Sequence, residues 1–235
     1  MAPPSDSSDP LSEGEDLSRA LECLESHGCV AFPTETVWGL AACALSETAL
    51  GNLRAWKSRS ENQPISLIVP GVEGLADLGF ALSPEARHLI DQFWPGPLTL
   101  VLDCNRVFPD GIAREDGAVG LRCSPHPIAH RLAQAAHERG LGPLTATSLN
   151  RSGEPAARNE AEARALCGQD PGSPYLLSCR GWESEGGSPS TVFDLTGSNP
   201  EILRAGAIPA EKLYSSLALR VSGGESTPPS GEQQE

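Results

Sequence analysis

The chain has 235 residues, of which 17 are basic and 31 are acidic, so its formal net charge is −14 at pH 7. Non-specific binding to a phosphate backbone needs clustered lysine and arginine, so this balance disfavours a protein that clamps nucleic acid directly. At roughly 150 residues per domain, the length fits one large domain or two small ones, with room for a sizeable core in either case.

The acidic excess is concentrated at the two ends of the chain. Residues 1–16 and 221–235 carry eight acidic groups and no basic one, which leaves a net charge of −6 on the part between them. Both ends are rich in Ser, Pro and Gly and poor in large apolar residues, a composition that does not offset the entropy of ordering. We therefore predict disordered acidic tails at 1–14 and 221–235 around a single domain at 15–220.

Neither a membrane span nor a secretory signal is evident. No apolar run reaches 18 residues, and the N-terminus is acidic where a signal peptide would be basic and then apolar. The seven cysteines are scattered and contain no C-x-x-C pair. The sequence therefore predicts a soluble, cytoplasmic protein with no membrane contact, whose cysteines are reduced and mostly buried.

Short β-branched runs alternate with amphipathic stretches of helical spacing, a pattern typical of an α/β fold. Helices are predicted over the stripe Leu17–Leu24 with Gly28 as its cap, from Ser46 to Trp56, from Ser83, over Pro127–Arg139 and from Pro209. Strands are predicted over Cys29–Pro33, Ile65–Val69, Leu98–Leu102, Ala118–Arg122, Leu144–Thr147, Tyr175–Cys179 and Thr191–Leu195, with another ending at Arg204. The glycine-rich stretch 181–189 is predicted to be a loop.

Two threonines follow the first predicted strand at positions i and i+2, namely Thr34 and Thr36. An extended backbone points both hydroxyls to the same side. One interpretation is a strand end where threonine serves β propensity. The other is a hydroxyl pair that binds a polar small molecule.

Three basic residues stand at positions suited to an anionic ligand. Lys57 and Arg59 follow the second predicted helix, and Lys57 is one of only two lysines beside 15 arginines. A retained lysine suggests a point charge that a planar guanidinium would not supply, although cations also complement a helix C-terminus. Arg122 closes a predicted strand, where cations of an α/β sheet commonly face a ligand crevice.

Further polar side chains end or open predicted strands: Ser148, Asn150, Ser190 and Arg204. Ser148 and Asn150 share one face of an extended segment. Hydroxyl, amide and cationic groups of this kind are what an anionic nucleotide and a small zwitterion require.

Several familiar signatures are missing. The sequence has no G-x-x-x-x-G-K-[ST], G-x-G-x-x-G, H-E-x-x-H or G-x-S-x-G motif. His126, His130 and His137 have helical spacing and raise a metal site as one interpretation, but no carboxylate or cysteine completes a ligand set, so solvated histidines are favoured. The run 94–97 (WPGP) is predicted to be a rigid turn that packs its aromatic ring beneath the following strand.

Seven motifs occur in a fixed order: FPTETVWGLA (32–41), K-x-R (57–59), FWPGPLTLVL (93–102), GLR before PHP (120–127), S-x-N (148–150), STVFD (190–194) and ILRAG (202–206). Their order and spacing resemble those of the YrdC-like threonylcarbamoyl-adenylate synthases, and the resemblance extends over about residues 17–215. No single motif is specific to this family, but seven of them in the family's order and at compatible spacing are strong evidence for the resemblance.

This resemblance implies a twisted open mixed sheet with flanking helices and a concave, positively lined cleft. It implies a nucleotidyltransferase that makes L-threonylcarbamoyladenylate from ATP, L-threonine and bicarbonate for threonylcarbamoyl modification of tRNA. Mg²⁺ would accompany ATP without a dedicated protein metal site. The product would pass to a separate tRNA threonylcarbamoyl transferase, with little direct tRNA binding by this chain.

Carried over by motif, the resemblance assigns L-threonine binding to Thr34, Thr36, Arg122, Ala146 and Ser190. It assigns ATP binding to Lys57, Arg59, Gln63, Ser148, Asn150 and Arg204. Lys57 and Arg59 are also the expected catalytic residues, and both are expected in a solvent-accessible cleft.

The sequence departs from the family pattern at a few positions. Ser60 stands where proline is frequent, Trp38 where Tyr or Phe is usual, and Thr147 and Leu149 flank Ser148 where Ala is commoner.

Two other functions are compatible with the same fold. One is a non-catalytic RNA-binding module, and the other is a divergent carbamoyl-adenylate-forming relative.

Overall fold

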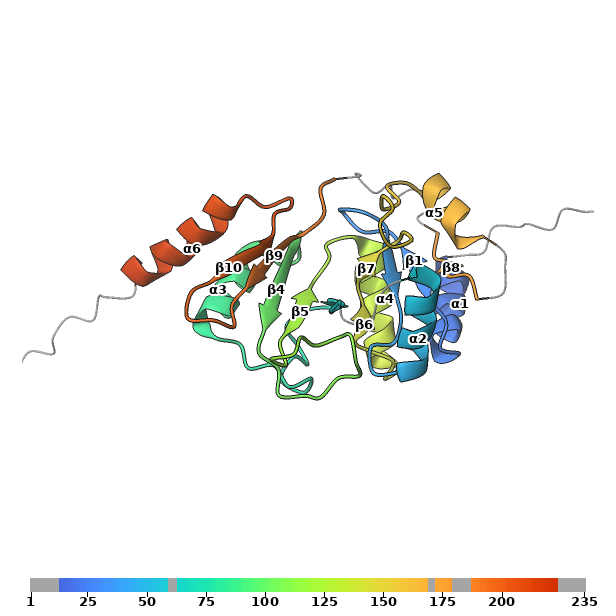
Figure 1. Cartoon of the computed structure of the whole chain (residues 1–235), viewed down its shortest axis with the longest axis horizontal. Helices are drawn as coiled ribbons and strands as arrows, with labels where there is room; N and C mark the ends of the chain where they lie inside the picture. Colours follow the sequence, from blue (N-terminus) through green and yellow to red (C-terminus); the bar gives the residue numbers. More distant parts are fainter. Residues whose placement is uncertain (1–12, 59–62, 169–171, 179–186, 224–235) are drawn as a thin grey trace, which may run out of the picture.

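The computed structural model describes residues 13–58, 63–168, 172–178 and 187–223 (Figure 1). The predicted tails fall almost wholly outside these residues, although the first helix already begins at Glu13 and the last reaches Gly223. Arg59, Cys179 and most of the predicted glycine-rich loop also lie outside them.

The elements follow one another as an α/β chain. The helices are α1 (Glu13–Glu25), α2 (Glu47–Lys57), α3 (Pro84–Phe93), α4 (Pro127–Glu138), α5 (Glu160–Cys167) and α6 (Ala210–Gly223). The strands are β1 (Val30–Phe32), β2 (Gly39–Ala41), β3 (Leu67–Ile68), β4 (Leu98–Leu102), β5 (Val119–Arg122), β6 (Leu144–Thr145), β7 (Thr147–Ser148), β8 (Tyr175–Leu176), β9 (Thr191–Asp194) and β10 (Glu201–Arg204).

The described strands form two mixed sheets, where the sequence led us to expect one. The smaller sheet has the order β7-β2-β1-β8, and the larger has the order β10-β9-β4-β5-β3-β6. Each combines parallel and antiparallel pairs: β4 runs parallel to β9 and antiparallel to β5, and β1 runs parallel to β8 and antiparallel to β2. The α/β class is confirmed, and the division into two sheets sets the position of the site.

The chain crosses between the sheets at Ala146. The predicted strand over 144–147 is divided there, because β6 pairs with β3 of the larger sheet and β7 pairs with β2 of the smaller one. Thr145 is fully buried, and its hydroxyl accepts from the backbone N–H of Ala42 (2.9 Å) and donates to the carbonyl of Leu40 (3.4 Å). A buried hydroxyl satisfied on both sides thus links β6 to the neighbouring sheet.

Side-chain caps explain where the helices begin. Ser46 accepts from the N–H of Ala49 at the start of α2, and Ser83 accepts from the N–H of Ala86 at the start of α3. At the first helix the cap differs from the prediction. The left-handed residue is His27 (φ 60°), and Gly28 follows it in a turn so tight that a Cβ would lie 2.9 Å from a backbone oxygen.

Two elements were not predicted. Strand β2 is only three residues long, and its Gly-Leu-Ala sequence carries no β-branched residue. Helix α5 does have a start signal in the sequence, because the Asn159 side chain accepts from the N–H of Glu162 (2.9 Å) while the Glu162 carboxylate accepts from the N–H of Arg158 (2.8 Å). The pair resembles a capping box but differs from one, because the Glu162 carboxylate accepts from the N–H of Arg158 and not from that of the cap residue Asn159.

The helices cover the two ends of the molecule (Figure 1). Helices α3 and α6 pack together beside the larger sheet, and α1, α2 and α5 lie near the smaller one. Two side chains of α6 contact the rest of the molecule. The ring of Tyr214 packs edge-on against Phe193, with 5.4 Å between the ring centroids, and Ser216 Oγ lies 2.9 Å from His88 Nε2. Among the described helices, none combines the length and apolar character that a membrane span needs.

The predicted thiol environment is confirmed for the cysteines that the structure describes. Four of the six are buried and all six are free thiols: Cys23, Cys29, Cys43, Cys104, Cys123 and Cys167. Burial raises the pKa of Cys29 to about 12 and that of Cys123 to about 11, so both are neutral thiols at physiological pH.

Leu100 lies at the centre of the larger sheet and is fully buried, which makes it a test of how much that sheet contributes. We expect Leu100→Ala to lower the free energy of unfolding by about 2–5 kcal/mol, because the lost side chain leaves a cavity between packed layers. Urea unfolding followed by circular dichroism measures this value. Val107→Ala, at a side chain that is 92% exposed, is the matched control, and a change of equal size there would contradict the interpretation.

Candidate functional site

A cavity of about 180 Å³ lies where residues of both sheets meet. Phe32, Gly39 and Ser148 line it from the smaller sheet, and Thr99 and Arg122 from the larger one. The cavity brings together seven residues that the sequence assigned to substrate: Thr34, Thr36, Arg122, Ala146, Ser148, Ser190 and Arg204. Its lining contains no carboxylate.

The two threonines lie in the loop between β1 and β2, not in a strand, and both hydroxyls are buried. Arg122 Nη2 donates to Thr36 Oγ1 (2.9 Å), the two threonine hydroxyls are 3.0 Å apart, and Thr34 Oγ1 donates to the carbonyl of Val37 (2.6 Å). The Thr34 hydroxyl has one proton, which it donates to the carbonyl of Val37. In the hydrogen bond between the two threonines, the Thr36 hydroxyl is therefore the donor and Thr34 Oγ1 the acceptor. The threonine pair therefore fixes one side of the Arg122 guanidinium.

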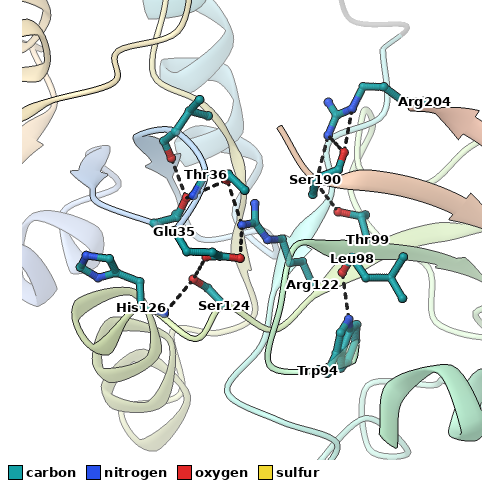
Figure 2. A network of polar contacts seen from close by, with 12 residues as sticks. Glu35, Thr36, Trp94, Leu98, Thr99, Arg122, Ser124, His126, Ser190 and Arg204 are labelled. Carbon is teal, nitrogen blue, oxygen red and sulfur yellow. Dashed lines mark hydrogen bonds and ion pairs between the residues drawn. The ribbon is translucent and has the colours of Figure 1, made fainter. Parts of the chain in front are cut away.

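A carboxylate that sequence reasoning missed holds the same guanidinium. Arg122 Nη2 donates to Glu35 Oε1 at 2.6 Å, and Ser124 Oγ donates to Glu35 Oε2 at 2.5 Å (Figure 2). Glu35 stands between the two threonines in the sequence, so an acidic residue within the T-E-T motif was the available signal.

On the opposite wall, Ser190 is the centre of a second network. Its hydroxyl lies 2.8 Å from Thr99 Oγ1, and Arg204 Nη2 donates to both the carbonyl (2.8 Å) and the hydroxyl (3.0 Å) of Ser190 (Figure 2). Gly206 lets these segments approach, because a Cβ there would lie 2.3 Å from the carbonyl oxygen of Pro189. Thr99 is a further site residue that sequence reasoning missed.

One arginine of the cavity acts electrostatically on the other. The pKa of Arg204 is lowered, first by burial and second by the positive charge of Arg122. An arginine stays protonated at any physiological pH, so both side chains remain cationic. Since Arg122 is already paired with Glu35, an anionic ligand would offset the positive charge that remains at the cavity.

Lys57 is buried, at 2% exposure, so the expected solvent-accessible position was wrong. Its ammonium donates to the carbonyl oxygens of Ser148 (2.5 Å) and Asn150 (2.9 Å) and to Asn150 Oδ1 (2.9 Å). The Ser148 hydroxyl also donates to Asn150 Oδ1 (2.6 Å), which confirms that these two side chains lie together. A buried charge needs such close oxygen partners. The S-x-N turn supplies them, so its backbone wraps around the Lys57 ammonium.

A second, larger cavity of about 700 Å³ adjoins the first and shares Val37, Ser148, Pro189 and Arg204 with it. Asn150 lines this second cavity. Gln63 is exposed and lines neither cavity, although the neighbouring Pro64 lines the first. Of the residues predicted to bind ATP, Ser148, Asn150 and Arg204 line the larger cavity together. Gln63 lines neither cavity, and Arg59 lies outside the described residues.

The histidines do not form a metal site in the described part of the chain, where no group of three or more His, Cys, Asp and Glu side chains comes together. His126 was expected to be a solvated histidine, but it is buried and caps α4 by accepting from the N–H of Ile128 (3.3 Å). Burial lowers its pKa, and the nearby negative charge of Glu35 partly opposes that shift.

The sequence profile of the Sua5/YciO/YrdC family, described as telomere recombination, matches residues 22–206. The chain therefore belongs to the Sua5/YciO/YrdC family. It is 31% identical over 214 residues to a putative threonylcarbamoyl-AMP synthase of Mycobacterium tuberculosis, covering 91% of this chain and 94% of the relative.

A threonylcarbamoyl-AMP synthase of Pyrococcus abyssi is 36% identical over 187 residues, which cover 78% of this chain and 52% of the relative. The crystal structure of P. abyssi Sua5 complexed with L-threonine superposes with a TM-score of 0.76 at 32% identity, covering 88% of this chain and 58% of that one. In both comparisons the chain spans little more than half the length of its Pyrococcus counterpart, and the predicted family fold is confirmed.

The burial of the Lys57 ammonium leads to a prediction about the stability of the fold. We expect Lys57→Met to lower the free energy of unfolding by about 2–3 kcal/mol, because the buried oxygens of the S-x-N turn lose a charged donor. Urea unfolding measures the change. Lys212→Met, at the exposed second lysine, is the control, and an equal loss in both variants would argue against this role for Lys57.

Proposed function

We propose that this chain is a threonylcarbamoyl-AMP synthase that joins L-threonine, bicarbonate and ATP and releases pyrophosphate. The name that its Mycobacterium and Pyrococcus relatives carry supports this activity. Within the structure, the strongest support is the pair of adjoining cavities that share Ser148 and Arg204. A small cavity and a large one with a common wall suit an amino acid and a nucleotide that must react with each other.

The smaller cavity is the threonine end of the proposed site. The Arg122 guanidinium suits the α-carboxylate, because its N–H groups match the geometry of a carboxylate. Thr36, Ser190 and the backbone at Ala146 line the same cavity and supply further polar partners. A volume of about 180 Å³ accommodates a small amino acid rather than a bulky acyl acceptor.

The proposed chemistry needs no side-chain nucleophile. The free amine of threonine attacks the carbon of bicarbonate and water leaves, which gives an N-carboxylate. One oxygen of that carboxylate attacks the α-phosphorus of ATP, the bond from this phosphorus to the bridging oxygen breaks, and pyrophosphate leaves with the electron pair. Such a reaction depends mainly on positioning and on stabilising phosphoryl charge.

The nucleotide end of the proposed site is the larger cavity. Arg204 lies in the wall common to both cavities, so its charge is placed beside the bond that forms between the two substrates. Asn150 and Ser148 offer polar contacts, and Lys57 acts by holding their turn in shape. We therefore assign Lys57 a positioning role, whereas Arg59 keeps the phosphate-binding role that the family motif suggests.

Magnesium enters this proposal as part of the substrate MgATP. The smaller cavity has no carboxylate in its walls, and the larger has Glu154. A single carboxylate is too small a donor set for a metal site made by the protein alone, and Mg²⁺ usually takes one or two carboxylates together with substrate phosphates. The ion would therefore be bound through the nucleotide.

Two further features belong to the proposal. The reaction class is nucleotidyl transfer, and the product is a mixed anhydride that hydrolyses in water. A separate tRNA-binding transferase must then take it up, which agrees with the acidic composition of this chain. Neither the RNA-binding module nor the carbamoyl-adenylate alternative is favoured, since both relatives above carry the synthase name.

The reaction predicts a strict dependence on three substrates. Pyrophosphate release, followed by a coupled phosphate assay, should need ATP, L-threonine and bicarbonate together, and omission of any one should reduce it to background. Release of pyrophosphate without threonine would contradict the proposal.

The family motif predicts the effect of Arg59→Ala. Loss of a phosphate-binding cation should lower kcat/KM for ATP by about tenfold or more, with little change in unfolding free energy. Steady-state kinetics and urea unfolding measure the two quantities. Arg87→Ala, at an exposed residue of α3, is the control, and equal kinetics in both variants would show that the K-x-R motif has no role here.

A further inference from the structure

Glu35 has a position that the proposed chemistry does not use directly. It lies in the loop between β1 and β2, between Thr34 and Thr36, yet it does not line the smaller cavity. Its carboxylate turns toward the end of β5 and the start of α4, where both oxygens are occupied (Figure 2). Oε1 accepts from Arg122 and Oε2 accepts from Ser124, so the carboxylate acts on Arg122 from outside the cavity.

Ser124 holds the carboxylate in one orientation. Its side chain is buried at 1% exposure, and its hydroxyl oxygen accepts from the backbone N–H of His126 at 3.2 Å. With that lone pair in use, the hydroxyl proton is directed to Glu35 Oε2. His126 in turn caps α4, so the position of the Glu35 carboxylate is set by the start of a helix and not by a mobile side chain.

Among the described residues, the hydrogen bonds that hold Arg122 all come from one nitrogen of its guanidinium. Its hydrogen bonds to Glu35 (2.6 Å) and Thr36 (2.9 Å) both come from Nη2. Its Nε is buried without a hydrogen-bond partner among the described residues. Anchoring one nitrogen fixes the plane of the guanidinium while leaving donors for a ligand carboxylate.

Charge strengthens the case for Glu35. Arg122 and Arg204 both line the cavity, and the charge of Arg122 lowers the pKa of Arg204. The hydrogen bonds of Arg204 go to the neutral oxygens of Ser190. Glu35 pairs with Arg122 and so offsets part of the positive charge that Arg122 and Arg204 bring to the cavity.

We propose that Glu35 is a positioning residue that orients Arg122 to receive the carboxylate of the amino-acid substrate. It acts through Arg122 and touches neither substrate. The identity of the substrate rests on the proposed function, but the coupling between Glu35 and Arg122 is a property of this chain's own contacts.

Glu35→Gln tests this coupling, because it keeps the shape of the side chain and removes its charge. The expected result is a rise of tenfold or more in KM and in calorimetric Kd for L-threonine, with KM for ATP within twofold of wild type and an unchanged melting temperature. Glu35→Asp should recover part of the threonine affinity. Glu25→Gln, which breaks the exposed ion pair to Arg139, is the matched control and should change none of these values.

A second variant tests whether the effect passes through Arg122. In an Arg122→Gln background, Glu35→Gln should cause no further loss of kcat/KM for threonine, whereas independent roles would make the two losses multiply. A threonine KM in Glu35→Gln within twofold of wild type would overturn the proposal. Equal increases in KM for threonine and ATP, with a lowered melting temperature, would also overturn it, since they indicate a purely structural role.

The two readouts separate this inference from the proposed function. A wild-type protein that binds threonine but releases no pyrophosphate would refute the synthase activity, and a tenfold weaker Kd in Glu35→Gln would still support the role of Glu35. A wild-type protein that does not bind threonine at all would overturn both.

Discussion

The arrangement of the site depends on a short extended run, 144–148, that belongs to both sheets. Its first half pairs with β3 and its second half pairs with β2, and Ala146 lies at the crossing. The N–H of Ala146 donates to the carbonyl of Ser66 at 2.7 Å, and the buried Thr145 hydroxyl bonds to the backbone around β2. Because the Ala146 N–H and the buried Thr145 hydroxyl both have hydrogen-bond partners, the sheets diverge at a defined place, and the cavity lies beside it.

The net charge of the chain and the charge of its cavity have opposite signs. The whole sequence carries −14, yet Arg122 and Arg204 line a cavity whose walls hold no carboxylate. Affinity for a small anion depends on the nearest charges in a poorly solvated place, while binding to a long polyanion depends on a broad surface field. An acidic protein can therefore bind a small anion such as a nucleotide without holding RNA, as the proposed function requires.

Local signals in the sequence accounted for much of the fold. Ser46 and Ser83 were recognisable caps, and the strand over 98–102 was predicted with its observed bounds. Brief elements such as β2 carry too few residues to show a period, so their strand character comes from their neighbours. The division of one predicted strand at Ala146 likewise follows from pairing with two different sheets, which no local pattern records.

The site was predicted in its residue types better than in its contacts. The motifs pointed to Thr36, Arg122, Ser190 and Arg204, and the structure places all four around one cavity. The ion pair between Arg122 and Glu35 joins residues 87 positions apart, so no spacing rule could reveal it. The K-x-R motif led us to expect Lys57 in a solvent-accessible cleft, whereas its oxygen partners in the S-x-N turn, which bury it, lie more than 90 positions away along the chain.

The burial of Lys57 has a practical consequence for experiments on this protein. The chain has only two lysine side chains, and the other, Lys212, lies exposed on α6 with its ammonium over the Phe93 ring of α3. Of the two lysine side chains, Lys212 is the one that an amine-reactive dye can reach, because the ammonium of Lys57 is enclosed by the oxygens of Ser148 and Asn150. A fluorophore attached there reports from a helix that lines neither cavity, so ligand binding can be followed by anisotropy or energy transfer without altering the site.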